Sequence, residues 1–149
     1  MGIIRITREF RFEAAHALRG YDGPCSSVHG HSYTLSVTVT GHPIVDQDSP
    51  KLGMIMDFGD LKNLIRNNVI RQFDHSLILD SSLGKEGAVP RNELFSNVIF
   101  VDFQPTSENL LLDFAERIRK ILPPGISLHH LLLRETASSY AEWFSSDQE

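Results

Sequence analysis

Hydrophobic and polar residues alternate along two early stretches of the chain. Every second position from Tyr33 to Val39 is apolar, and the positions between them are Ser or Thr. Residues 3–16 also alternate and become more apolar towards their end. A period of two is typical of a strand with one buried face, so 3–16 and 31–41 are predicted as strands. The Gly-, Pro- and Ser-rich residues between them predict a loop.

Two later segments repeat apolar residues at helical spacing. The first begins near Asp57, a favourable helix N-cap, and its apolar stripe comprises Phe58, Leu61, Leu64, Ile65, Val69 and Phe73. The second follows Pro105, is capped by Thr106 or Ser107, and ends before the Pro-Pro-Gly of 123–125. Its stripe comprises Leu110, Leu111, Phe114, Ile118, Ile121 and Leu122.

The remaining segments predict further strands. Residues 97–103 are a short strand candidate, and 126–136 with 140–144 are typical of a closing hairpin. The main order is two strands, helix, helix, two strands. This order predicts a single α+β domain over 1–149, with both helices covering one face of a mostly antiparallel sheet.

Composition narrows the class of protein. The chain of 149 residues is 41% hydrophobic, enough for a core, and its formal net charge is -5. An acidic chain without a Lys/Arg run is a poor candidate for binding nucleic acid or anionic membranes. No apolar run approaches a membrane span, and the early charges argue against a signal peptide. The single cysteine excludes an internal disulfide and fits a reducing compartment, so a cytoplasmic protein is predicted.

Three histidines form a candidate metal site. His29 and His31 are two residues apart at a strand start, so their side chains point to the same side. If the first two strands pair as a hairpin, His16 comes level with them. Three neutral imidazoles with an open fourth position are the usual form of catalytic zinc. The competing interpretation is that these are ordinary strand histidines.

Other residues could carry acid–base chemistry, each with an ordinary structural alternative. Cys25 lies four residues before His29 and could be a lowered-pKa thiol or a small buried residue. Asp74-His75 could form a proton relay or simply end a helix. Glu135 is expected on the core face of its strand, where a buried carboxylate needs a hydrogen-bond donor such as a ligand. The alternative is an edge residue whose side chain reaches solvent. Glu108 could simply favour the helix dipole.

Taken together, these segments resemble the 6-pyruvoyltetrahydropterin synthase and 6-carboxytetrahydropterin synthase family. The motifs that carry the resemblance run in the family's order from residue 10 to about 136: FEAAHAL, CSSVHGHSY, GMIMDFGDLK, FDHSLILD, PTSENLL and LRET. The three residues between the cysteine and the HGH sequence resemble the carboxytetrahydropterin type. The stretch 79–104 is expected to be an extended insertion that affects substrate preference more than chemistry.

The resemblance implies a set of roles. It implies a zinc ion on His16, His29 and His31, with Cys25 as the proton-abstracting base. Asp74 and His75 would form a relay supplied across a subunit boundary. Glu135 would anchor the pterin's amide and amino edge and take part in catalysis, with two further residues beside the pterin, Thr106 and Glu108.

The resemblance also implies a fold and a reaction. The fold would be the tunnelling fold, a four-stranded antiparallel sheet with two helices on one face, assembled into a barrel and a homo-hexamer. The reaction would convert 7,8-dihydroneopterin triphosphate to 6-carboxy-5,6,7,8-tetrahydropterin with release of acetaldehyde and triphosphate, in queuosine and 7-deazapurine biosynthesis. The alternatives are a 6-pyruvoyltetrahydropterin synthase and a non-catalytic, zinc-stabilised assembly protein.

Overall fold

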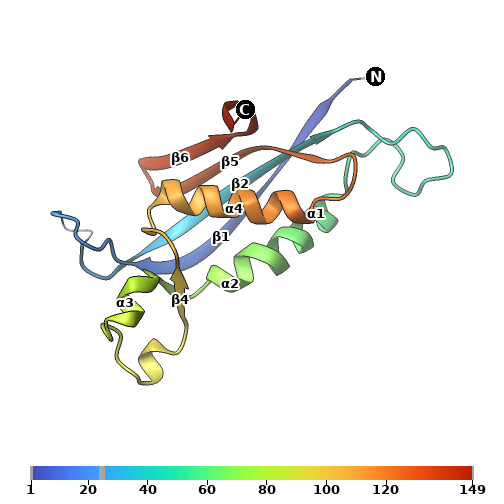
Figure 1. Cartoon of the computed structure of the whole chain (residues 1–149). Coiled ribbons are helices and arrows are strands. Elements are labelled where there is room, and N and C mark those ends of the chain that lie inside the picture. The colour runs from blue at the N-terminus through green and yellow to red at the C-terminus, as the bar shows by residue number, and fades with distance from the viewer. Residues whose placement is uncertain (1, 24–25, 149) are drawn as a thin grey trace.

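The fold is built on a six-stranded mixed sheet, in the order β4-β3-β1-β2-β5-β6 (Figure 1). The computed structural model describes residues 2–23 and 26–148. Strands β1, β2, β5 and β6 pair antiparallel, whereas β3 joins β1, and β4 joins β3, in parallel. The strands are β1 Ile4–His16, β2 His29–Gly41, β3 Ser76–Asp80, β4 Val98–Val101, β5 Ser127–Thr136 and β6 Ser139–Phe144.

The predicted α+β class is confirmed, but the expected number of four strands is wrong. The two added strands, β3 and β4, lie together at one edge. Strand β4 falls within the candidate 97–103, and β3 was not predicted at all. The reason is physical: β3 is five residues long, pairs with only the last three residues of β1, and is mostly covered. A short covered parallel strand shows no alternation.

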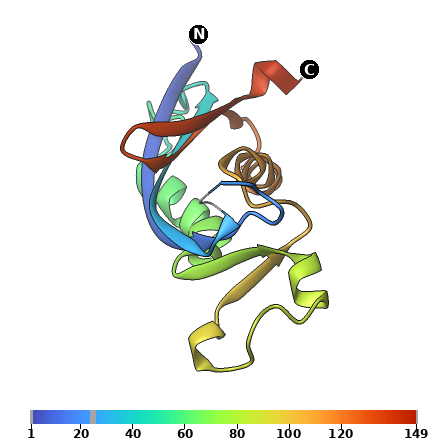
Figure 2. The same ribbon diagram turned by 90° about the vertical axis from the view of Figure 1, so that its left-hand side faces the viewer.

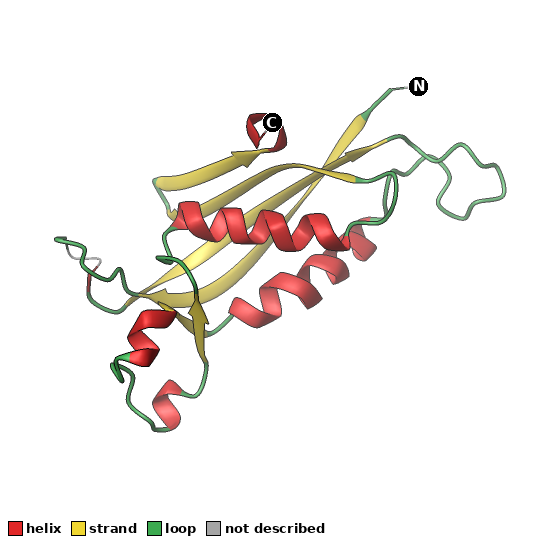
Figure 3. Ribbon diagram, in the orientation of Figure 1, coloured by secondary structure: helices red, strands yellow, loops and turns green. Residues whose placement is uncertain are grey.

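The helices lie on one face of the sheet, as predicted (Figure 3). The first stretch consists of α1 Phe58–Ile65, a π-helical turn η2 Arg66–Ile70 and α2 Arg71–Phe73. The Asp57 carboxylate caps it by accepting hydrogen bonds from the amides of Gly59 and Asp60. The second helix is α4 Ser107–Ile121, capped by the Thr106 hydroxyl, which accepts from the Asn109 amide. Phe58, expected in the apolar stripe, is half exposed in the first turn.

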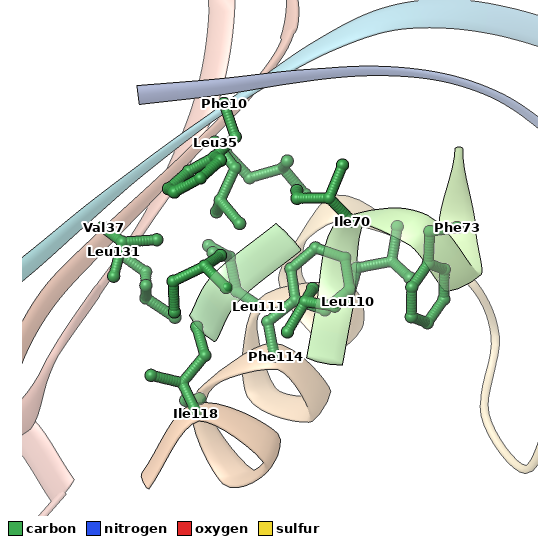
Figure 4. Packing of buried hydrophobic residues seen from close by; sticks show 14 of the residues in the cluster. Phe10, Leu35, Val37, Ile70, Phe73, Leu110, Leu111, Phe114, Ile118 and Leu131 are labelled. Atoms are coloured by element: carbon green, nitrogen blue, oxygen red, sulfur yellow. The ribbon is translucent and has the colours of Figure 1, made fainter. Parts of the chain in front are cut away.

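The hydrophobic core fills the space between the curled sheet and the helices (Figures 2 and 4). The predicted inward face of β2, from Tyr33 to Val39, is fully buried. Phe12 stacks on Tyr33 at 4.9 Å between ring centroids, and Phe114 of α4 meets both Phe12 and Phe73 edge-on. This packing fixes α4 over the ends of β1 and β2 that carry the candidate metal ligands.

The stretch 79–104 folds as part of the sheet edge. It completes β3, forms α3 Ser81–Lys85 and the 3-10 turn η3 Glu93–Phe95, and returns as β4. The helical turns of this stretch lie below α4 in both ribbon views (Figures 1 and 2). A last 3-10 turn, η4 Ser145–Gln148, follows β6. Among the described residues, no helix has the length and apolar character that a bilayer span requires.

Candidate metal centre and active site

Three histidine side chains converge where β1 ends and β2 begins. In the antiparallel register His16 pairs with His29, and Ala14 pairs with His31. Alternation therefore puts all three imidazoles on the helix-covered face of the sheet. One ring nitrogen of each lies within 4.8 Å of the others. The predicted grouping of His16, His29 and His31 is present in the fold.

Hydrogen bonds from the far side of two rings fix their orientation. The Nδ1 atom of His16 lies 2.7 Å from the Pro105 carbonyl oxygen, and that of His29 lies 2.7 Å from the Ser27 carbonyl oxygen. A carbonyl only accepts, so each Nδ1 carries the proton and each Nε2 presents a lone pair. These two Nε2 atoms face each other at 3.1 Å. Two facing lone pairs repel unless a cation lies between them.

The third histidine adds an unsatisfied atom to the same point. The Nε2 atom of His31 is buried and has no hydrogen-bond partner within residues 2–23 and 26–148. Desolvation by burial lowers the pKa of both His16 and His31, which keeps the imidazoles neutral as metal ligands must be. Zn–N bonds of about 2.0–2.1 Å in tetrahedral geometry separate two nitrogens by roughly 3.3 Å. The donor set, the two tautomers fixed by carbonyl groups and the 3.1 Å between the Nε2 atoms of His16 and His29 therefore fit a zinc ion.

A cleft of about 270 Å³ opens beside these histidines, lined by His16, Leu18, Tyr21, Thr106, Ser107, Glu108, Glu135, Ser139, Tyr140 and Ala141. Three of the predicted ligand-contacting residues, Thr106, Glu108 and Glu135, thus share one cavity. Glu135 Oε1 lies 3.5 Å from Nε2 of His16 and 3.4 Å from Nε2 of His31. A carboxylate and one of the candidate metal ligands therefore meet within one pocket.

The Asp74-His75 pair forms a dyad in the fold. The Asp74 carboxylate lies 3.0 Å from Nδ1 of His75 and also accepts the amide of Glu13 at 2.9 Å. The backbone of His75 is held on both sides, because its amide donates to the Glu13 carbonyl and its carbonyl accepts from Asn97. His75 has φ 59°, an uncommon conformation for a non-glycine residue and one often found at functional sites.

Neither residue of this dyad is among the described residues that line the cleft beside His16. His75 helps to line a second hollow, together with residues that include Glu13, Gly30, Ser32 and His31. Glu13 and Ser32 alternate with the inward-facing residues of β1 and β2 and so lie on the opposite face of the sheet. The side chain of His75 is 77% exposed. The ring is thus free to approach a site on another molecule.

Cys25, the remaining predicted catalytic residue, lies outside the described residues, so its role stays a prediction. Its sequence neighbours Gly23 and Ser26 belong to the loop that joins the two ligand-bearing strands β1 and β2.

Comparison with known proteins decides the family. Residues 5–145 match the family described as 6-pyruvoyl tetrahydropterin synthase. The chain belongs to this family. The resemblance that the motifs indicated is therefore confirmed, together with the expectation of a pterin-synthase enzyme.

Relatives in the 6-pyruvoyl tetrahydropterin synthase family carry more than one name. The 6-carboxy-5,6,7,8-tetrahydropterin synthase of Haemophilus influenzae is 30% identical over 143 residues, covering 95% of this chain and 99% of its own. The enzyme of that name from Synechocystis sp. is 34% identical, with coverages of 94% and 92%. A dihydroneopterin monophosphate aldolase of Pyrococcus furiosus is 32% identical, with coverages of 88% and 89%.

A solved structure supports the predicted fold of the family. The 6-pyruvoyl tetrahydropterin synthase of Caenorhabditis elegans superimposes with a TM-score of 0.69 at 25% identity, covering 97% of each chain.

Two features of this family member's site escaped sequence reasoning. The Pro105 carbonyl that orients His16 is a backbone group, and no residue type signals its role. Gln104, just before it, bonds to the loop after β1 across 85 positions. Only the fold brings these groups together, because both contacts are long-range.

Proposed function

We propose that the chain is a zinc-dependent 6-carboxy-5,6,7,8-tetrahydropterin synthase. It would convert 7,8-dihydroneopterin triphosphate to 6-carboxy-5,6,7,8-tetrahydropterin with release of acetaldehyde and triphosphate, a step towards queuosine and other 7-deazapurines. The observation that carries this proposal is the convergence of three imidazoles beside a cleft whose lining includes His16 and Glu135. The names of relatives at 30–34% identity support the choice of reaction.

His16, His29 and His31 hold the zinc ion in this proposal. Bound there, zinc supplies Lewis-acid polarisation of the hydroxyl groups on the substrate side chain. The Pro105 and Ser27 carbonyls keep two of the ligands in the Nε2-accepting tautomer, as is common for metal-bound histidine. The three ligands found among the described residues leave a coordination position for substrate, whereas a purely structural zinc normally has four protein ligands. This count favours catalysis over a zinc-stabilised assembly protein.

Glu135 anchors the pterin by accepting from its amide and amino groups, a fork of donors that suits a carboxylate. Its partly exposed side chain reaches the cleft. Thr106 and Glu108 lie beside the pterin at the start of α4. The Thr106 hydroxyl accepts a hydrogen bond from the Asn109 amide as a helix cap. Its O–H group remains available to donate a hydrogen bond to the pterin.

Cys25 takes a proton from the substrate side chain as a thiolate, and His75 gives or takes the hydroxyl proton on the opposite side. Asp74 bonds to Nδ1 of His75, which leaves Nε2 available for that transfer. Since His75 is largely exposed and does not line the cleft beside His16, the dyad serves the site of a neighbouring subunit. A homo-hexamer of two trimeric barrels, with sites at subunit interfaces, provides this arrangement.

The experiment is incubation of the zinc-loaded protein with 7,8-dihydroneopterin triphosphate, followed by mass measurement of the pterin and an acetaldehyde assay. The proposal requires the carboxylated product and acetaldehyde in equal amounts. A retained diketo side chain without acetaldehyde would instead indicate a 6-pyruvoyltetrahydropterin synthase. Turnover of only the monophosphate would indicate an activity like that of the Pyrococcus furiosus relative. A protein that binds no pterin and unfolds on zinc removal would be an assembly protein.

A further inference from the structure

Gln104 makes a reciprocal pair of hydrogen bonds to the backbone of Arg19. Its side-chain oxygen accepts the Arg19 amide at 3.1 Å, and its side-chain nitrogen donates to the Arg19 carbonyl at 2.8 Å. The side chain thus occupies both backbone groups of Arg19, as a neighbouring strand would. A glutamine has the acceptor and donor that this pairing needs, whereas an apolar side chain has neither.

The backbone of Gln104 is itself fixed to the start of α4. Its carbonyl oxygen accepts from the side-chain amide of Asn109 at 3.0 Å and from the Thr106 amide at 2.8 Å. The next residue, Pro105, supplies the carbonyl that orients His16. Gln104 therefore belongs to the rigid turn that also supports a metal ligand.

The segment that Gln104 holds forms one wall of the cleft. Leu18 and Tyr21, on either side of Arg19, both line the cavity beside His16. The Tyr21 amide donates to the Leu18 carbonyl, which closes the backbone into a turn around Arg19. This segment is also the first part of the loop that contains Cys25 in the sequence.

The loop has a further contact on its outer side. The Arg19 guanidinium donates to the Ser82 hydroxyl at 2.7 Å and pairs with the Glu86 carboxylate. The side chains of Arg19 and Glu86 are about half exposed, so their ion pair contributes little to the stability of the loop. The backbone pairing with Gln104 is the contact that defines where the chain leaves β1.

We propose that Gln104 is a positioning residue that sets the loop after β1 against the cleft and the metal ligands. Its influence on turnover rests on the proposed function, while its influence on the loop does not. Misplacement of a reacting group by about 1 Å can lower a rate roughly a hundredfold. Substrate binding depends also on Glu135 and Thr106. Gln104 contacts Thr106 through its backbone carbonyl, which a substitution of the side chain retains.

The test is the Gln104→Leu variant, loaded with zinc. Against wild type, kcat should fall roughly tenfold or more while KM for dihydroneopterin triphosphate rises less than about threefold. The zinc content should match wild type. Hydrogen exchange of a peptide covering 17–23, which contains the Arg19 amide, should become faster. Gln47→Leu is the matched control, since it removes a similar amide-to-carbonyl bond, to Val45, in an exposed loop.

Exchange of 17–23 at the wild-type rate would overturn the inference whether or not the protein is active. An unchanged kcat in Gln104→Leu would also overturn it. A loss of zinc in proportion to the loss of kcat would overturn it as well, because the effect would then come from the metal ligand. If wild type fails to turn over the substrate while Gln104→Leu still exchanges faster at 17–23, the proposed function would be wrong, and the role of Gln104 in holding the loop would be confirmed.

Discussion

The Nδ1 atom of His16 lies 2.7 Å from the carbonyl oxygen of Pro105, a residue 89 positions further along the chain. This contact joins the end of β1 to the turn that begins α4. The Nε2 atom of His16, a candidate metal ligand, and the cleft wall at Thr106 therefore take their positions from one junction. A change at this junction is expected to affect metal geometry and substrate position together.

Removing one histidine should remove the metal. His31→Ala deletes a buried Nε2 atom of the cluster, leaving two of the three described histidine ligands. Purified wild type should retain about one zinc per chain after dialysis, and the variant close to none. Elemental analysis measures both, and His42→Ala, an exposed histidine outside the cluster, should keep its zinc. Full zinc retention by His31→Ala would contradict the three-histidine site.

Replacing the single cysteine should stop catalysis without loss of zinc. Loss of a positioned acid or base typically lowers a rate by about 10²–10⁴-fold, so Cys25→Ala should lower kcat within that range. Steady-state turnover of dihydroneopterin triphosphate and elemental analysis measure the two effects. Ser26→Ala is the neighbouring control. Near-normal turnover by Cys25→Ala would end its assignment as the base.

Sites shared between subunits should allow two inactive chains to restore each other. His75→Ala and Cys25→Ala each remove one half of the proposed proton-transfer pair. After the two are mixed by reversible dissociation, about a quarter of the sites should combine an intact Cys25 with an intact His75 of another subunit. Activity should reappear on mixing, in proportion to co-assembly measured by native mass spectrometry. If the mixed oligomers remain inactive, the dyad does not act across a subunit boundary.

The metal-free protein should lose stability as the pH falls below 6.5. Burial lowers the pKa of His16 and His31 below the ordinary 6.5, although the Glu135 carboxylate acts in the opposite direction. Below 6.5 the unfolded chain therefore binds more protons than the folded chain, and the free energy of unfolding decreases. Above pH 6.5 the unfolded chain no longer binds these extra protons, so the free energy of unfolding keeps its full value.

Thermal unfolding in a chelator between pH 8 and 5.5 measures this effect. The decline below pH 6.5 should be shallower in His16→Gln, which lacks one of the two groups. A variant with the same decline as wild type would show that other groups cause it.

The sequence predicted those parts of the fold that have a strong local pattern. The alternation of 31–41 fixed the buried face of β2, and the helical stripe with its Thr106 cap fixed α4. Strand β3 was missed because its five residues are largely covered and do not alternate. The parallel edge that it forms with β4 depends on contacts with β1, which no local pattern contains.

By itself the sequence determined the chemistry available to this protein. The HGH spacing put two imidazoles on one side of a strand, and the antiparallel pairing implied by that pattern added His16. The tertiary structure decided which atoms of those rings are free, because the Pro105 and Ser27 carbonyls fix the tautomers. It also decided that His75 is largely exposed and lines a different hollow from the cleft beside His16, and that Gln104 holds the loop after β1. Those outcomes depend on long-range backbone contacts, which exist only when the chain is folded.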